Sequence, residues 1–118
     1  MKVLVVDDHD INRKLPMAIL SRLGIAVAEA ENGPEALDKM RADPGIRHVL
    51  LDVSMPGMSG TEVCAILRAQ PDGGELRIVA YTAHAFPTEK QKIMSAGFDE
   101  LLLKPINREA LLRVLGIA

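Results

Sequence analysis

Short apolar runs alternate along this chain with longer stretches in which apolar residues recur every three or four positions. The runs are continuous and bounded by turn residues, which is typical of strands buried on both faces of a sheet. They predict strands at residues 2–6, 26–30, 48–51, 77–81 and 100–103, and the pattern is weakest at 26–30. The stretches between them have the spacing of helices, as at Ile11, Leu15, Ile19 and Leu23.

Turn and capping residues mark where several of these helices begin. Pro34, after Asn32, suits the first turn of the second helix, because its missing N–H is not needed there. Thr88 and Gln91 have the spacing of a capping box for the fourth helix. Asn107 is placed to cap the fifth.

A strand followed by a helix, five times over, predicts an α/β fold in which a parallel sheet is covered by helices on both faces. Right-handed crossovers favour the flavodoxin-like, doubly wound order 2-1-3-4-5 for five strands and five helices. We expect residues 1–118 to form one domain, since 118 residues suffice for one core and not for two.

Composition narrows the function classes. The chain is 48% hydrophobic and 25% charged with a formal net charge of −2, so neither disorder nor a nucleic-acid surface is indicated. We find no apolar run of membrane-spanning length and no signal-peptide pattern, and we expect a cytoplasmic protein. Cys64 is the single cysteine, which excludes an intrachain disulfide, and we expect it to be a small buried hydrophobe.

Polar side chains follow four of the five predicted strands. Asp7 and Asp8 come after the first strand, Asp52 after the third, Thr82 after the fourth and Lys104 after the fifth. One such carboxylate is most often a turn former or a helix cap. Carboxyl ends of parallel strands share one edge, however, and ligands bind there where the strand order reverses. The pattern therefore predicts a site between the first and third strands.

The charges of this cluster suggest a cation and a phosphoryl group. Three carboxylates and one ammonium carry a formal charge of −2, and two like charges ~4 Å apart repel by about 4 kcal/mol even at an effective dielectric of ~20. Oxygen ligands favour Mg²⁺ or Mn²⁺ over Zn²⁺. A cation, a lysine and a hydroxyl together suit a phosphoryl group, and a carboxylate such as Asp52 can itself be the nucleophile.

The chain resembles the receiver domain of two-component response regulators from its first residue to the last helix. The matching segments, in order and at the usual spacing, are VLVVDDHDINRK, AENGPEAL, LLDVSMPGMSG, IVAYTAHA and LLLKPIN. The most specific is the third, in which an Asp is followed at fixed distances by Met-Pro and Gly.

The resemblance implies a role for each residue of the site. Asp52 would accept a phosphoryl group from a phosphohistidine on a histidine kinase or histidine phosphotransfer protein. Mg²⁺ would be held by the carboxylates of Asp7, Asp8 and Asp52 and by the backbone carbonyl of Ser54. Lys104 would pair with the phosphoryl oxygens.

Further residues follow from the same resemblance. Thr82 would move to hydrogen-bond the phosphoryl group, and the side chains of Ser54 and His84 would modulate its lifetime. The peptide bond before Pro105 is expected to be cis. His9 is expected to be a surface residue.

One departure affects the expected switch. Receivers usually carry Tyr or Phe three residues before the lysine, and here that position is Leu101. The response to phosphorylation would lie in the fourth helix, the fifth strand and the fifth helix, and Leu101 offers no aromatic ring for the usual readout. Tyr81 and Phe86 are interpreted as packing residues.

Other functions remain open. The chain could be a pseudo-receiver that only docks to partners, or a Mg²⁺-dependent phosphohydrolase acting through an aspartyl phosphate. A flavin-binding role is disfavoured, because acidic residues occupy the place where a flavodoxin would cradle phosphate. The sequence does not identify the cognate kinase, the downstream partner or the oligomeric state. It also does not show whether the chain stands alone or belongs to a hybrid kinase.

Overall fold

A computed structural model describes residues 1–83 and 86–116. Five strands alternate with five helices and one short 3₁₀ helix, η1, of residues Gly73–Glu75. The strands are β1 (Lys2–Val6), β2 (Ala26–Ala30), β3 (His48–Asp52), β4 (Arg77–Thr82) and β5 (Glu100–Leu103). The helices are α1 (Asp10–Arg22), α2 (Gly33–Ala42), α3 (Gly60–Ala69), α4 (Pro87–Ser95) and α5 (Arg108–Val114).

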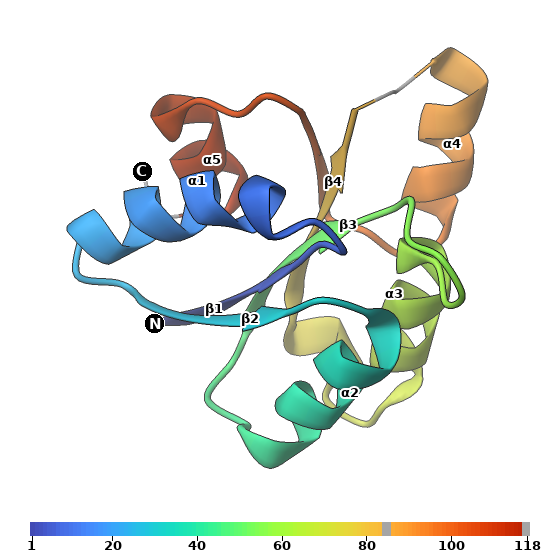
Figure 1. The fold of residues 1–118 in the computed structure, drawn as a ribbon. Coiled ribbons are helices and arrows are strands. Elements are labelled where there is room, and N and C mark those ends of the chain that lie inside the picture. Colours follow the sequence, from blue (N-terminus) through green and yellow to red (C-terminus); the bar gives the residue numbers. More distant parts are fainter. Residues whose placement is uncertain (84–85, 117–118) are drawn as a thin grey trace.

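The strands form one parallel sheet in the order β2-β1-β3-β4-β5, which confirms the predicted topology (Figure 1). Strands β3 and β4 each extend one residue further than predicted, so Asp52 and Thr82 are the last residues of their strands. The register pairs Val6 with Leu51 and Asp52 with Tyr81. The carboxyl ends of β1, β3 and β4 therefore meet at one edge.

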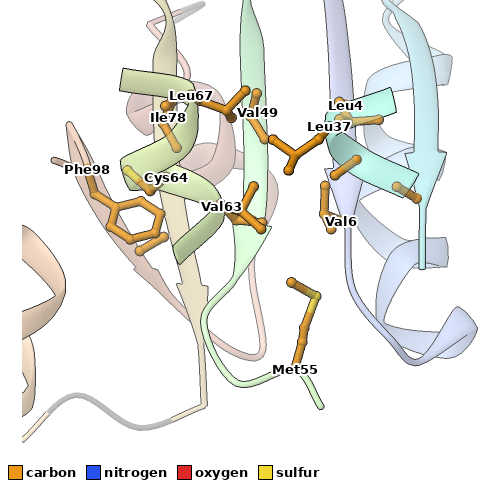
Figure 2. Close-up of a cluster of buried hydrophobic side chains, with 14 of the residues drawn as sticks. Leu4, Val6, Leu37, Val49, Met55, Val63, Cys64, Leu67, Ile78 and Phe98 are labelled. Atoms are coloured by element: carbon orange, nitrogen blue, oxygen red, sulfur yellow. The ribbon is translucent and has the colours of Figure 1, made fainter. Parts of the chain in front are cut away.

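Buried residues form a core on each face of the sheet. Alternate strand residues point to opposite faces, so Val5 and Val79 join Leu20 of α1 and Leu111 of α5 in one cluster. The other cluster joins strand residues to α2 and α3; Figure 2 labels Leu4, Val6, Leu37, Val49, Met55, Val63, Cys64, Leu67, Ile78 and Phe98 in it. Helices thus cover both faces, as a doubly wound fold requires.

Helix α1 packs onto the sheet with a different face from its most regular apolar stripe. Arg13, Pro16 and Leu20 are its buried residues. Ile11 is 71% exposed and Leu15 46% exposed, although both belong to the spacing that predicted the helix. Spacing identifies a helix but does not tell which of its faces meets the sheet.

The helix starts agree with the capping predictions except at α4. Asn32 accepts a hydrogen bond from the amide of Glu35 at 2.8 Å, and Asn107 accepts one from Ala110 at 2.8 Å. The capping box predicted at Thr88 is wrong, because α4 begins at Pro87 and its N-cap residue is Phe86. Pro is favoured at the first helical position, so the helix starts earlier and Thr88 lies inside it.

Helix α4 is held to the rest of the domain at few points. Within α4, all of which the structure describes, Ile93 alone is buried. In Figure 1 this helix, in orange, lies at the periphery of the molecule. Among the described helices, none has the length and apolar character needed to cross a membrane.

Arg68 of α3 anchors the connection from α4 to β5. Its Nε donates to the carbonyl of Gly97 at 2.8 Å, and its Nη2 pairs with Asp99 at 2.6 Å. Its Nη1 donates to the carbonyls of Gly73 and Leu76, both at 2.7 Å. One side chain therefore joins α3, η1, the start of β4 and the segment that leads into β5.

We expect Arg68→Met to lower the free energy of unfolding by about 2–3 kcal/mol, because partly buried carbonyls lose a charged donor. Urea denaturation measures this change. The control is Arg41→Met, whose ion pair with Asp38 is exposed at the surface, with an expected change within about 0.5 kcal/mol. Equal losses in the two variants would show that Arg68 is not an anchor.

Candidate functional site

The predicted polar residues come together at the carboxyl edge of the sheet. Asp7 is fully buried, Asp52 is 4% exposed and Thr82 is 5% exposed. A pocket of about 250 Å³ opens at this edge, and its lining includes Asp8, Ser54 and Thr82 together with Asp52 and Lys104. Residues from the segments after β1 and β5 and from the ends of β3 and β4 thus share one site.

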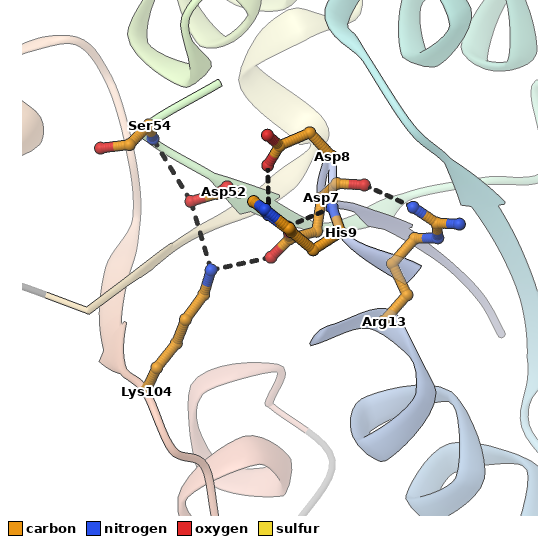
Figure 3. Close-up of polar contacts among 7 residues, drawn as sticks. All are labelled: Asp7, Asp8, His9, Arg13, Asp52, Ser54 and Lys104. Atoms are coloured by element: carbon orange, nitrogen blue, oxygen red, sulfur yellow. Dashed lines mark hydrogen bonds and ion pairs between the residues drawn. The ribbon is translucent and has the colours of Figure 1, made fainter. Parts of the chain in front are cut away.

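Lys104 joins the two buried carboxylates (Figure 3). Its Nζ lies 2.7 Å from Oδ2 of Asp7 and 3.4 Å from Oδ1 of Asp52. The peptide bond between Lys104 and Pro105 is cis, the isomer that the resemblance implies. Lys104 follows β5, so its side chain approaches Asp7 and Asp52 from one side of the site. The two acids lie on the other side, where β1 and β3 end.

The two carboxylates have opposite pKa shifts. Burial disfavours the charged form of Asp7, but hydrogen bonds from Lys104 and from the amide of His9 outweigh it and lower its pKa. Burial and the negative charge of Asp7 raise the pKa of Asp52 to about 6, against a partial opposing effect of Lys104. Asp7 is therefore the firmly ionised partner of the lysine. The negative charge of Asp52 is only partly balanced by Lys104.

Asp8 and His9 complete the acidic side of the pocket. Among the described residues, Asp7, Asp8 and His9 offer ligand atoms within 4.8 Å of one another. Nδ1 of His9 lies 3.1 Å from Oδ1 of Asp8, and the imidazole is 68% exposed, as expected for a surface residue. Ser54 is exposed, and its amide donates to Oδ1 of Asp52 at 3.3 Å.

Arg13 is a part of the site that sequence reasoning missed. Its Nη1 donates to the backbone carbonyl of Asp7 at 2.6 Å (Figure 3). Its Nε pairs with Glu29 of β2 at 2.9 Å. Arg13 therefore ties the backbone of the acidic pair to both α1 and β2. Its place on the same helical face as Pro16 and Leu20 was a signal for burial.

The remaining predicted residues have mixed outcomes. Leu101 is half-buried and packs against the α2 and α3 side of the core. His84 lies outside the described residues. Tyr81 is buried in the core, and burial, with the charges of Asp7 and Asp52, raises its pKa to about 12.

The packing role predicted for Phe86 is wrong. This residue is 65% exposed. It immediately precedes α4, which contributes only one buried residue to the described core, so the sheet does not cover it.

Comparison with known proteins identifies this arrangement. A family model described as the response regulator receiver domain matches residues 3–116. The chain belongs to this family. Receiver domains are signalling modules of two-component systems and not enzymes in the usual sense, and in general they bind Mg²⁺ in an acidic pocket.

Relatives of this receiver domain occur within histidine kinases. It is 37% identical over 121 residues to hybrid signal transduction histidine kinase I of Dictyostelium discoideum, covering 98% of this chain and 7% of the kinase. It is 37% identical over 116 residues to the sensor histidine kinase GacS of Pseudomonas protegens, covering 96% and 12%. The receiver domain thus spans a small part of each kinase.

A solved structure has the same fold over nearly the whole of both chains. The chemotaxis protein CheY4 of Vibrio cholerae matches this receiver domain with a TM-score of 0.90 and 34% sequence identity. The match covers 98% of this chain and 95% of that one.

The raised pKa predicts that Asp52→Asn stabilises the metal-free domain. The ordinary pKa of an aspartate carboxyl is 3.8, and that of Asp52 in the fold is about 6. The ionised carboxylate of Asp52 therefore lowers the stability of the fold fully above about pH 6, and this loss disappears as the pH falls below 3.8. At about 1.36 kcal/mol per pKa unit, we expect a gain of roughly 2–3 kcal/mol near pH 7.5, falling to about 1 kcal/mol near pH 4.5.

Urea denaturation in the presence of a chelator measures both values. Asp38→Asn is the control, since the side chain of Asp38 is 76% exposed, and we expect it to leave the stability nearly unchanged. An Asp52→Asn variant no more stable than the wild type near pH 7.5 would contradict the raised pKa.

Proposed function

We propose that this receiver domain accepts a phosphoryl group on Asp52 from a phosphohistidine of a histidine kinase or histidine phosphotransfer protein. The observation that carries the proposal is a buried carboxylate at the end of β3, 3.4 Å from Lys104 and open to a pocket. With a pKa of about 6, Asp52 is mostly ionised near neutral pH and is available as a nucleophile.

The transfer exchanges one bond to phosphorus for another. An Oδ atom of Asp52 forms the bond to phosphorus, the phosphorus–nitrogen bond of the donor breaks, and the imidazole nitrogen keeps the electron pair and takes up a proton. Negative charge spread over the phosphoryl oxygens must be balanced from several sides. Lys104 is placed to supply part of this balance, and Thr82 offers a hydroxyl on the same pocket.

The donor set fits Mg²⁺. The carboxylates of Asp7, Asp8 and Asp52, with the carbonyl of Ser54, would hold the ion, and hard oxygen ligands are those that Mg²⁺ prefers. When bound, the ion supplies positive charge to the transferring group. The raised pKa of Asp52, caused in part by Asp7, supports a site that lacks positive charge. Mn²⁺ would fit the same ligands.

An exposed apolar surface beside the pocket is our candidate for docking the phosphate donor. Ile11 and Leu15 of α1 line a second pocket together with Tyr81 and Pro105, and Lys104 lines both pockets. Because Lys104 lines both pockets, a partner that presents a histidine to Asp52 would lie close to this surface.

The response to phosphorylation is proposed for α4, β5 and α5. A phosphoryl group replaces one negative charge by nearly two and adds acceptor oxygens, to which the loops at this edge respond. The sparse burial of α4 supports its movement, since few contacts have to be broken. Leu101 leaves no aromatic side chain at the usual switch position. We propose a cytoplasmic setting, with 1–118 as one receiver unit.

We expect the wild-type chain to gain the mass of one phosphoryl group when incubated with acetyl phosphate and Mg²⁺, and the gain to disappear with a chelator. Asp52→Asn removes the nucleophile, so we expect no gain. Asp38→Asn, at an exposed carboxylate, is expected to label as the wild type does. Intact-protein mass spectrometry measures all of these.

Three outcomes would overturn parts of this proposal. Full labelling of Asp52→Asn would show that another residue is the acceptor. No labelling of the wild type would favour a docking module that is not phosphorylated. Continuous hydrolysis of an added phosphate ester would favour a phosphohydrolase.

A second experiment tests the docking surface. We expect Ile11→Ser with Leu15→Ser to slow transfer from a phosphohistidine protein about 10-fold or more, because apolar contact area is lost. Labelling by acetyl phosphate is expected to stay unchanged. Ile66→Ser on α3 is the matched control, since Ile66 is 41% exposed and lies on a different helix. An unchanged transfer rate in the α1 variant, or an equal loss in both variants, would contradict a specific docking role for α1.

A further inference from the structure

The ammonium of Lys104 has a third partner besides the two carboxylates. Its Nζ lies 4.7 Å from the ring centroid of Tyr81, within the range of a cation–π contact. A lysine ammonium has three N–H groups, and here two carboxylates and one aromatic face surround it. The side chain of Lys104 is 17% exposed, so water competes little for these partners.

The position of Tyr81 follows from the sheet and not from a local motif. Tyr81 is the neighbour of Asp52 in the register of β3 and β4, and its carbonyl accepts a hydrogen bond from Val53 at 3.3 Å. Tyr81 is 3% exposed and packs in the cluster that α1 and α5 cover. Its ring is therefore held in one place by the core, while it also lines the apolar pocket beside Lys104.

A fixed ring can restrict the position of the lysine ammonium. The four-carbon side chain of lysine is flexible, and a single ion pair leaves it many conformations. The contact with Asp7 at 2.7 Å is shorter than that with Asp52 at 3.4 Å, so the ion pairs alone favour the Asp7 side. The ring limits where the ammonium can lie, and it brings no negative charge into a site that already has too much.

We propose that Tyr81 is a positioning residue whose ring keeps the ammonium of Lys104 between Asp7 and Asp52, ready to meet a phosphoryl group on Asp52. The meeting of the ammonium with a phosphoryl group on Asp52 rests on the proposed function. The position of the ammonium between Asp7 and Asp52 does not. Tyr81 would thus have a role that its burial in the core does not by itself require.

The contact can be tested without any phosphoryl group. A methylene or ammonium group over an aromatic face experiences a ring current, so the εCH₂ protons of Lys104 should resonate upfield in the wild-type chain. We expect Tyr81→Phe to keep this shift and Tyr81→Leu to lose it. Absence of the shift in the wild type would overturn the contact. If Tyr81→Leu does not fold, the wild type and Tyr81→Phe decide the question.

The functional half is tested by the initial rate of labelling with acetyl phosphate and Mg²⁺. We expect Tyr81→Leu to label roughly 3- to 10-fold more slowly than the wild type, and Tyr81→Phe to label within about twofold of it. Val79→Ala is the control for packing, because Val79 lies in the same strand and the same cluster. We expect it to lower the stability and leave the labelling rate unchanged.

The outcomes separate this inference from the proposed function. A labelled wild type with Tyr81→Leu at the same rate would overturn the positioning role alone. An equal slowing in Val79→Ala would also overturn it, since loss of packing would then explain the effect. An unlabelled wild type would overturn the proposed function, and with it the step at which Lys104 meets the phosphoryl group.

Discussion

Two buried carboxylates with one lysine between them form the constraint on which this site depends. Asp7 has the shorter contact with Lys104 and a lowered pKa, so it takes most of the available positive charge. Asp52 is left with the longer contact, and burial and its neighbour raise its pKa to about 6. This imbalance makes Asp52 the carboxylate that gains most from a cation or from reaction with an electrophile.

The fold maintains this arrangement from several directions. The parallel register places the ends of β1, β3 and β4 at one edge, and clusters on both faces of the sheet hold those strands. Arg13 binds the backbone of Asp7, and Arg68 anchors the segment that leads through β5 to Lys104. A buried, unbalanced acid lowers stability, so it requires a scaffold that is stable elsewhere. The geometry of the site therefore depends on the packing of the core and on the contacts of Arg13 and Arg68.

The parts around the site differ in how firmly they are packed. The acid-bearing strands are buried on both faces, whereas α4 places one residue in the described core. Helix α1 combines a buried face that supports the acids with an exposed apolar stripe next to the pocket. Under the proposed function, these parts would serve as a fixed phosphoryl acceptor, a surface for the donor and a helix that can move.

By itself, the sequence determined the five strands to within a residue, their order, most helix starts and the polar residues at the strand ends that come together in the site. These depend on the period of apolar residues, on turn chemistry and on polar residues at strand ends, all of which are local. Only the tertiary structure decided which stripe of α1 is buried, that Arg13 supports Asp7, and that Tyr81 lies against Lys104. Arg13 is only six positions from Asp7, but their contact depends on which face of α1 packs on the sheet. The contact of Tyr81 with Lys104 depends on how β4 and the segment after β5 lie together in the folded sheet. The wrong predictions at Thr88 and Phe86 have the same origin, because both concern α4, where Pro87 and weak packing outweighed the local pattern.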